Sequence, residues 1–112
     1  MASVAYLDID QGSDFTAEMT LESDNGEAMN LTGFTVYSQF RKSFGSTIGH
    51  SFNTNIVNET AGVITLSLTG IYSSGIRPGR YLYDVEIVSI DGRKTRVVEG
   101  IVTINPEITR IP

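Results

Sequence analysis

The stretch Phe15-Thr16-Ala17-Glu18-Met19-Thr20-Leu21-Glu22 decides the fold, because apolar and polar residues alternate along it without a break. Successive side chains of a β-strand point to opposite faces, so a period of two places the apolar residues on one face and the polar residues on the other. A helix would scatter the same apolar residues around its surface. The stretch therefore predicts a strand with one buried face.

The same alternation recurs further along the chain, in Phe34 to Val36, Ile64 to Leu68 and Tyr81 to Ile87. Turn signals such as Ser23-Asp24-Asn25-Gly26 and Asp91-Gly92 separate the runs. An Asp-Gly pair favours a type I′ hairpin turn, because both residues tolerate a positive φ. The pattern predicts about seven antiparallel strands, over residues 4–10, 13–22, 34–42, 50–57, 62–68, 80–90 and 94–104, with a short extra strand or bend over 28–31.

A chain of 112 residues has the usual size of one domain. Short strands at regular spacing indicate a sandwich or a small barrel, and we predict an all-β, immunoglobulin-like β-sandwich over residues 1–104. Cysteine and tryptophan are absent, so the disulfide and core tryptophan that mark antibody domains are missing. The residues expected in the core are Phe15, Met19, Leu21, Val36, Leu66, Tyr83 and Val85.

The segment 69–79 breaks the alternation and is too long for a hairpin loop. We expect it to cross between the sheets and to hold a single helical turn. Tyr81 and Tyr83 follow at the start of the next predicted strand. In sandwich domains a tyrosine at this point often anchors the crossing loop through its hydroxyl group. Either tyrosine could do so here, or both could simply be half-buried rings.

Residues suited to metal binding are few. The only histidine, His50, lies in a polar stretch and has no cysteine or second histidine to share a metal with, so we expect a solvated loop side chain. Asp8, Asp10 and Asp14 offer carboxylate oxygens for calcium. They lack the further ligands of a calcium loop, and a solvated acidic face is the simpler interpretation. The sequence therefore predicts no metal and no cofactor.

Residues suited to catalysis are equally hard to find. Asp84 and Glu86 resemble the paired carboxylates of glycosidases, but they alternate with apolar residues and are better explained as an outward-facing polar row. The chain has no nucleophile elbow and no phosphate-binding glycine loop. We therefore expect a protein that is not an enzyme.

Charge is distributed unevenly along the chain. The net charge is −5, and acidic residues precede the first basic residue, Arg41. Basic residues cluster later, at Arg93, Lys94 and Arg96. An acidic protein is a poor partner for nucleic acid phosphates. The split suits head-to-tail packing with copies of itself or a neighbour, although ordinary solubilising charge explains it as well.

Both ends of the sequence carry further expectations. The N-terminus has no basic, apolar leader, and no stretch approaches the roughly 20 apolar residues of a membrane span, so we expect synthesis in a cytoplasm and no membrane partner. Pro106 and Pro112 bracket residues 105–112 and disfavour a strand or helix there. We expect an extended tail, with Glu107 and Arg110 as candidate partner contacts.

Three stretches resemble a known group of proteins: Leu7 to Phe15, Leu31 to Arg41, and Pro78 to Ile87 followed by Val97 to Arg110. In their order and in the closing Pro-Glu-Ile-Thr-Arg, the chain resembles small immunoglobulin-like tail and baseplate proteins of tailed bacteriophages, particularly contractile-tailed phages of marine hosts. The resemblance implies a structural virion component, made in the host cytoplasm and incorporated in several copies. Its partners would be other virion proteins or copies of itself, in a homo-oligomer.

A second hypothesis is a module that binds carbohydrate or a host surface. Stacking on a sugar needs exposed flat rings in loops, and the candidates are Phe44, Phe52 and Tyr72. An enzyme is the third hypothesis and the least favoured, since no catalytic group of residues is present.

Overall fold

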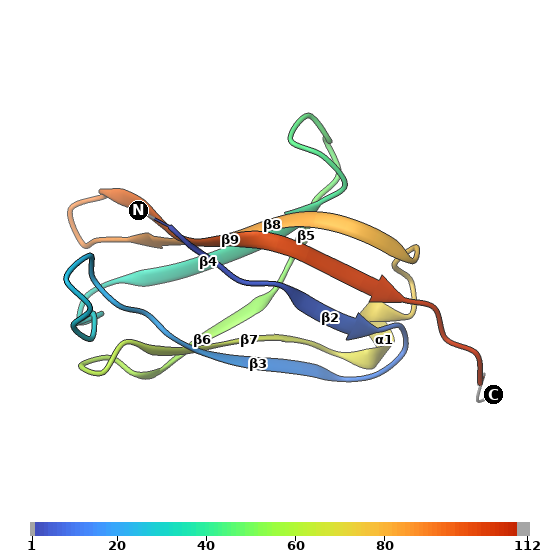
Figure 1. Cartoon of the computed structure of the whole chain (residues 1–112), viewed down its shortest axis with the longest axis horizontal. Coiled ribbons are helices and arrows are strands. Elements are labelled where there is room, and N and C mark those ends of the chain that lie inside the picture. Colours follow the sequence, from blue (N-terminus) through green and yellow to red (C-terminus); the bar gives the residue numbers. More distant parts are fainter. Residues whose placement is uncertain (1, 110–112) are drawn as a thin grey trace.

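The computed structural model describes residues 2–109 and consists of two β-sheets packed face to face (Figure 1). The larger sheet has the order β1-β9-β8-β4-β5, with β2 also paired to β9; its strands are β1 (Ser3–Val4), β2 (Leu7–Asp10), β4 (Thr35–Arg41), β5 (His50–Ser51), β8 (Gly79–Val88) and β9 (Lys94–Asn105). The smaller sheet has the order β3-β7-β6, formed by β3 (Phe15–Thr20), β6 (Asn53–Asn58) and β7 (Val63–Leu68). This strand order confirms the predicted immunoglobulin-like sandwich.

The first predicted strand differs from the prediction in direction and continuity. β1 and β2 both run parallel to β9, not antiparallel. The chain is kinked between them, where the Ala5 carbonyl turns inward and accepts a 2.8 Å hydrogen bond from the Tyr83 hydroxyl. A Cβ at Gly100 would clash with this carbonyl. The kink therefore depends on a tyrosine from β8 and a glycine from β9.

The predicted strand 50–57 is divided between the two sheets. β5 pairs with β4 in the larger sheet, whereas β6 pairs with β7 in the smaller one. Phe52 lies between them and is only 5% exposed, with its ring 5.0 Å from that of Phe40. The chain therefore passes from one sheet to the other at this buried ring. At the predicted extra strand, Ala28 forms only an isolated bridge with Glu22.

The hairpin at Asp91-Gly92 is present, but its predicted turn type is wrong. Gly92 has a φ of +89°. Among residues 2–109 only glycines have a positive φ, so Asp91 does not adopt the conformation that a type I′ turn requires. Instead the Gly92 amide donates to the Ser89 carbonyl, and the Ser89 amide donates to Arg93, each at 2.9 Å. These bonds fit a type I turn followed by a glycine bulge.

The core lies between the sheets. Five of the seven expected core residues are buried, and the other two, Phe15 and Met19, are partly buried against them. The crossing segment contains the predicted helical turn, α1 (Gly70–Ser73). Tyr81 anchors it, since its hydroxyl donates to the Arg77 carbonyl at 2.6 Å. Of the two candidate tyrosines, Tyr81 therefore holds the crossing loop and Tyr83 holds the first strand.

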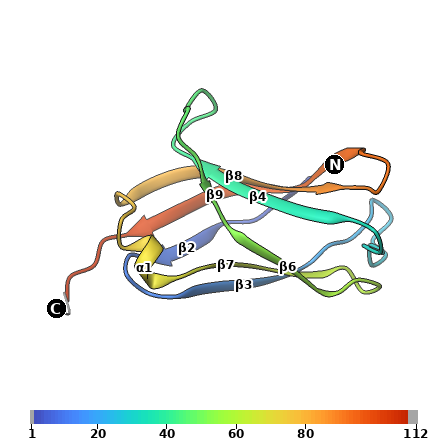
Figure 2. The same cartoon turned by 180° about the vertical axis from the view of Figure 1, so that it is seen from behind.

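Two features project from this body. The loop 42–49, between β4 and β5, stands out from the larger sheet in both views (Figures 1 and 2). The segment after Asn105 leaves at the end of the sandwich near α1, and the Glu107 amide donates to the Gln11 side chain at 3.0 Å. The first of these features forms part of the site described next.

Candidate binding groove

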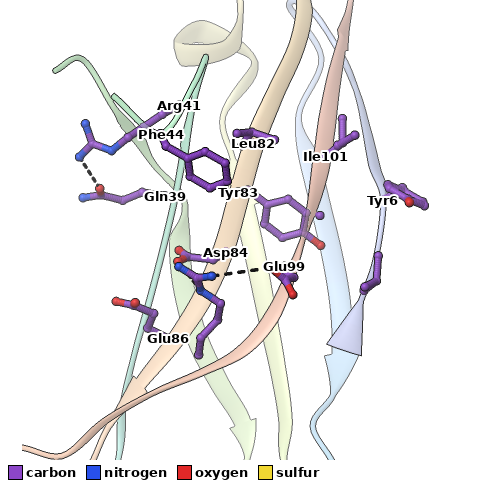
Figure 3. Close-up of a pocket in the computed structure, with 13 residues that line it drawn as sticks. Tyr6, Gln39, Arg41, Phe44, Leu82, Tyr83, Asp84, Glu86, Glu99 and Ile101 are labelled. Carbon is purple, nitrogen blue, oxygen red and sulfur yellow. Dashed lines mark hydrogen bonds and ion pairs between the residues drawn. The ribbon is translucent and has the colours of Figure 1, made fainter. Parts of the chain in front are cut away.

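A shallow groove of about 440 Å³ lies on the outer face of the larger sheet (Figure 3). We call it the outer groove. Its lining comes from β1, β4, β8 and β9, from the kink at Tyr6 and from the projecting loop at Phe44.

The apolar part of the groove has a base and two sides. Leu82 and Ile101 are register partners on the neighbouring strands β8 and β9, and both face outward, away from the core. Phe44 is 89% exposed and Tyr6 is 71% exposed. Figure 3 shows their rings on opposite sides of these two strands. Exposed rings gathered around apolar side chains are typical of a surface that binds a partner.

The charged part of the groove lies on the same two strands, below the apolar part in the view of Figure 3. Arg96 Nε donates to Asp84 Oδ2 at 3.2 Å, and Arg96 Nη1 lies 3.7 Å from Glu99 Oε2. Asp84 and Glu86 therefore form the predicted outward row, with Asp84 paired to the arginine. Exposed ion pairs of this kind add less than about 1 kcal/mol to stability. They orient side chains on the face more than they hold the fold.

The loop side of the groove is held in place by Arg41. Its guanidinium donates to Gln39 Oε1 at 2.9 Å and to the Ser46 carbonyl at 3.1 Å. One arginine thus connects β4 to the projecting loop that carries Phe44. The side chains of the outer groove are suited to apolar contact at Leu82 and Ile101 and to hydrogen bonds at Gln39 and the charged row.

The described residues hold no group of three or more side chains arranged to bind a metal ion. Two of the aspartates considered for calcium have bonds within the chain instead. Asp14 Oδ1 accepts from the Gly70 amide at 2.7 Å, at the start of α1, and Asp10 Oδ1 accepts from the Asn105 side chain at 3.2 Å. Within residues 2–109, no helix is long and apolar enough to cross a bilayer.

The structure separates the aromatic candidates. Phe44 lines the groove, and it is the one candidate that does. Phe52 was expected to be exposed, and this is wrong, because its ring packs between those of Phe15 and Phe40 in the core. Tyr72 is 45% exposed on α1, away from the groove.

The tail candidates lie elsewhere too. Glu107 is half-buried against the turn at Gly12, where its carboxylate occupies the space that a Cβ would need. Arg110 lies outside the described residues. Neither is part of the outer groove.

The expectation of a solvated loop histidine is also wrong. His50 is half-buried on β5, with its ring 5.0 Å from that of Phe40. Its Nδ1 lies 2.9 Å from the Tyr72 hydroxyl. Burial lowers the pKa of His50 from its ordinary value of 6.5. The burial of His50 could not be predicted from the sequence pattern, because β5 is only two residues long.

Val4, Tyr6, Leu82 and Ile101 are groove residues that sequence reasoning did not single out. A signal for two of them is present in the pattern. Leu82 and Ile101 are apolar at positions that strict alternation assigns to water. No such signal marks Tyr6, since its place in the groove follows from the kink.

No family model matches the sequence, and no curated protein resembles it in sequence. Solved structures with a similar arrangement include an internalin-like protein of Listeria monocytogenes, with 18% identity, a TM-score of 0.46 and coverage of 93% of this chain. The chain spans 28% of that protein's length.

Two further structures are similar at comparable distance. The major subunit of aggregative adherence fimbriae type I of Escherichia coli has 13% identity and a TM-score of 0.41, with coverage of 93% of this chain and 91% of the subunit. A family 123 glycoside hydrolase of Clostridium perfringens has 9% identity and a TM-score of 0.42, with coverage of 95% of this chain and 23% of the enzyme.

Proposed function

We propose that this chain is a non-enzymatic structural subunit of a phage tail or baseplate, and that it docks on another virion protein, or on a copy of itself, through the outer groove. The observation that supports docking is the gathering of Val4, Tyr6 and Phe44 around one groove, each more than half exposed. Monomeric proteins rarely leave such patches uncovered, and aromatic side chains are enriched where proteins meet.

The phage assignment is supported by the resemblance of three stretches to tail and baseplate proteins. The virion location, the repeated copies and the absence of an activity follow from the same assignment. In this proposal the ion-paired row of Asp84, Arg96 and Glu99 gives the docking face its polar contacts. The two aromatic side chains supply most of the binding energy.

The test replaces both rings, as the double variant Tyr6→Ser and Phe44→Ser. Because both side chains are exposed, we expect the unfolding midpoint to stay unchanged. Incorporation into particles should fall at least tenfold when quantified by mass spectrometry of purified virions. The matched control is Ile90→Ser, which removes an apolar side chain that is 92% exposed on the hairpin, outside the groove. Normal incorporation of the double variant would contradict the proposal.

A second candidate function is carbohydrate binding in the same groove. It is favoured by the presence of two exposed rings in one groove with Asp84, Glu99 and Gln39, whose side chains can hydrogen-bond sugar hydroxyls. A glycan array distinguishes the candidates. Binding that the double variant loses would favour the carbohydrate module, whereas silence together with lost incorporation would favour protein docking.

A further inference from the structure

A second pocket, of about 590 Å³, lies where the projecting loop meets the start of β8. We call it the basic pocket. Its charged and polar lining consists of Lys42, Ser43, Ser46, Thr47, His50 and Arg77, together with Tyr81. No residue of this lining is shared with the outer groove.

Charge sets the basic pocket apart from the rest of the surface. The chain has 13 acidic and 8 basic residues, yet no carboxylate lines this pocket. Within residues 2–109, neither Lys42 nor Arg77 forms an ion pair, whereas Arg96 pairs with two carboxylates. The Lys42 ammonium lies 4.9 Å from the centre of the Tyr81 ring. Two cations without a counter-charge therefore face a hollow in an acidic protein.

The walls of the basic pocket are already held in place. Ser43 and Ser46 are joined by a backbone bond of 3.2 Å and by a contact of 3.0 Å between their hydroxyls. Arg41 fixes the Ser46 carbonyl from outside the pocket. On the opposite wall, the Tyr81 hydroxyl holds the backbone of Arg77. A ligand entering here would not have to order the main chain on either side.

We propose that the basic pocket binds a dianionic tetrahedral oxyanion, as inorganic phosphate or sulfate or as a phosphate monoester. Two positive charges match the charge of such a group. A guanidinium donates two parallel hydrogen bonds to it, and an ammonium adds a compact point charge. The hydroxyls of Ser43 and Thr47 are suited to the remaining oxygens. This inference goes beyond the docking function and does not depend on the outer groove.

The experiment titrates the purified chain with inorganic phosphate, sulfate, glucose 1-phosphate and acetate at constant ionic strength, followed by amide shifts in NMR spectra. Saturable shifts are expected at loop 42–49 and at Arg77 with each of the tetrahedral anions, and no saturation with acetate. Lys42→Gln and Arg77→Gln should each weaken binding about tenfold, as expected for a charge-assisted hydrogen bond. Arg93→Gln, on the far hairpin, is the matched control and should bind as the parent chain does.

The ligands separate the sources of the anion. Equal affinity for phosphate and glucose 1-phosphate supports a site that recognises the oxyanion alone, and tighter binding of the ester supports one that also contacts the sugar. The proposal is overturned if no anion saturates, if acetate binds as well as phosphate, or if Arg93→Gln weakens binding as much as Arg77→Gln. Both pocket side chains are exposed, and unchanged thermal unfolding of the variants confirms that they are folded.

Discussion

The two outer faces of the sandwich obey the same alternation but expose different chemistry. The outer face of the smaller sheet has polar side chains in register at its centre: Thr16, Ser67 and Asn53 form one row, and Glu18, Thr65 and Asn55 form the next. The outer face of the larger sheet carries apolar and aromatic side chains around a groove. The central rows of the smaller sheet are thus polar and solvated, whereas apolar side chains at outward positions around the groove mark a face that is suited to a partner.

The largest effect is expected from Gly100→Ala, because this residue of β9 faces the edge of the sheet at Ala5. A Cβ here meets the Ala5 carbonyl, so β1 and the kink that carries Tyr6 must move. We expect a loss of about 2–3 kcal/mol in the free energy of unfolding, measured with denaturant. Gly45→Ala is the control, since nothing lies within 4 Å of its added Cβ. Equal stability of the two variants would contradict the role given to Gly100.

Tyr83→Phe tests the same kink from the β8 side. The variant keeps the buried ring but leaves the Ala5 carbonyl without its donor, which costs about 1–2 kcal/mol. Burial raises the pKa of Tyr83 to about 12, so the hydroxyl remains a donor throughout the neutral range. Hydrogen exchange should rise along β1 and β2. Tyr81→Phe is the comparison, and here hydrogen exchange should rise near α1. The reversed pattern would show that Tyr83 does not hold the first strand and that Tyr81 does not hold the crossing loop.

Leu82→Lys and Thr65→Lys compare the two faces directly. Both residues are half-buried, outward-facing and central in their sheets. Each change should cost less than about 1 kcal/mol of stability. Leu82→Lys should reduce partner docking at least tenfold in co-sedimentation with particles, because it places a charge in the apolar base of the groove. Docking should survive Thr65→Lys, and equal losses would mean that the two faces are not distinct.

The smallest effect concerns pH. The pKa of His50 is lowered by burial, so the unfolded chain takes up a proton before the folded chain does. The stability that depends on neutral His50 is complete above a pH of about 6.5 and declines as the pH falls below it. His50→Gln should flatten the dependence of the unfolding free energy on pH in that window. An unchanged slope would show that other groups are responsible.

Several elements could be predicted from sequence, and the reasons are local. The strand at Phe15 alternates strictly, and the strand at Tyr81 has an apolar residue at every inward position from Tyr81 to Ile87. The helical turn and the tyrosine that anchors its loop follow from a break in that pattern. Phe52 and His50 were wrongly predicted to be exposed, because they lie where the chain passes between the sheets and no periodicity marks such a point. Of the residues that line the outer groove, Phe44 was the one predicted as a partner contact.

By itself, the sequence determined the all-β class, the two-layer sandwich and most of the core, because a period of two dictates which side chains face inward. Tertiary structure alone decided that the first strand runs parallel to the last and is kinked at Ala5. It also brought Tyr6, Phe44, Leu82 and Ile101 to one groove, and Lys42 and Arg77 to one pocket. These residues are far apart in the chain, and no local pattern records which strands become neighbours.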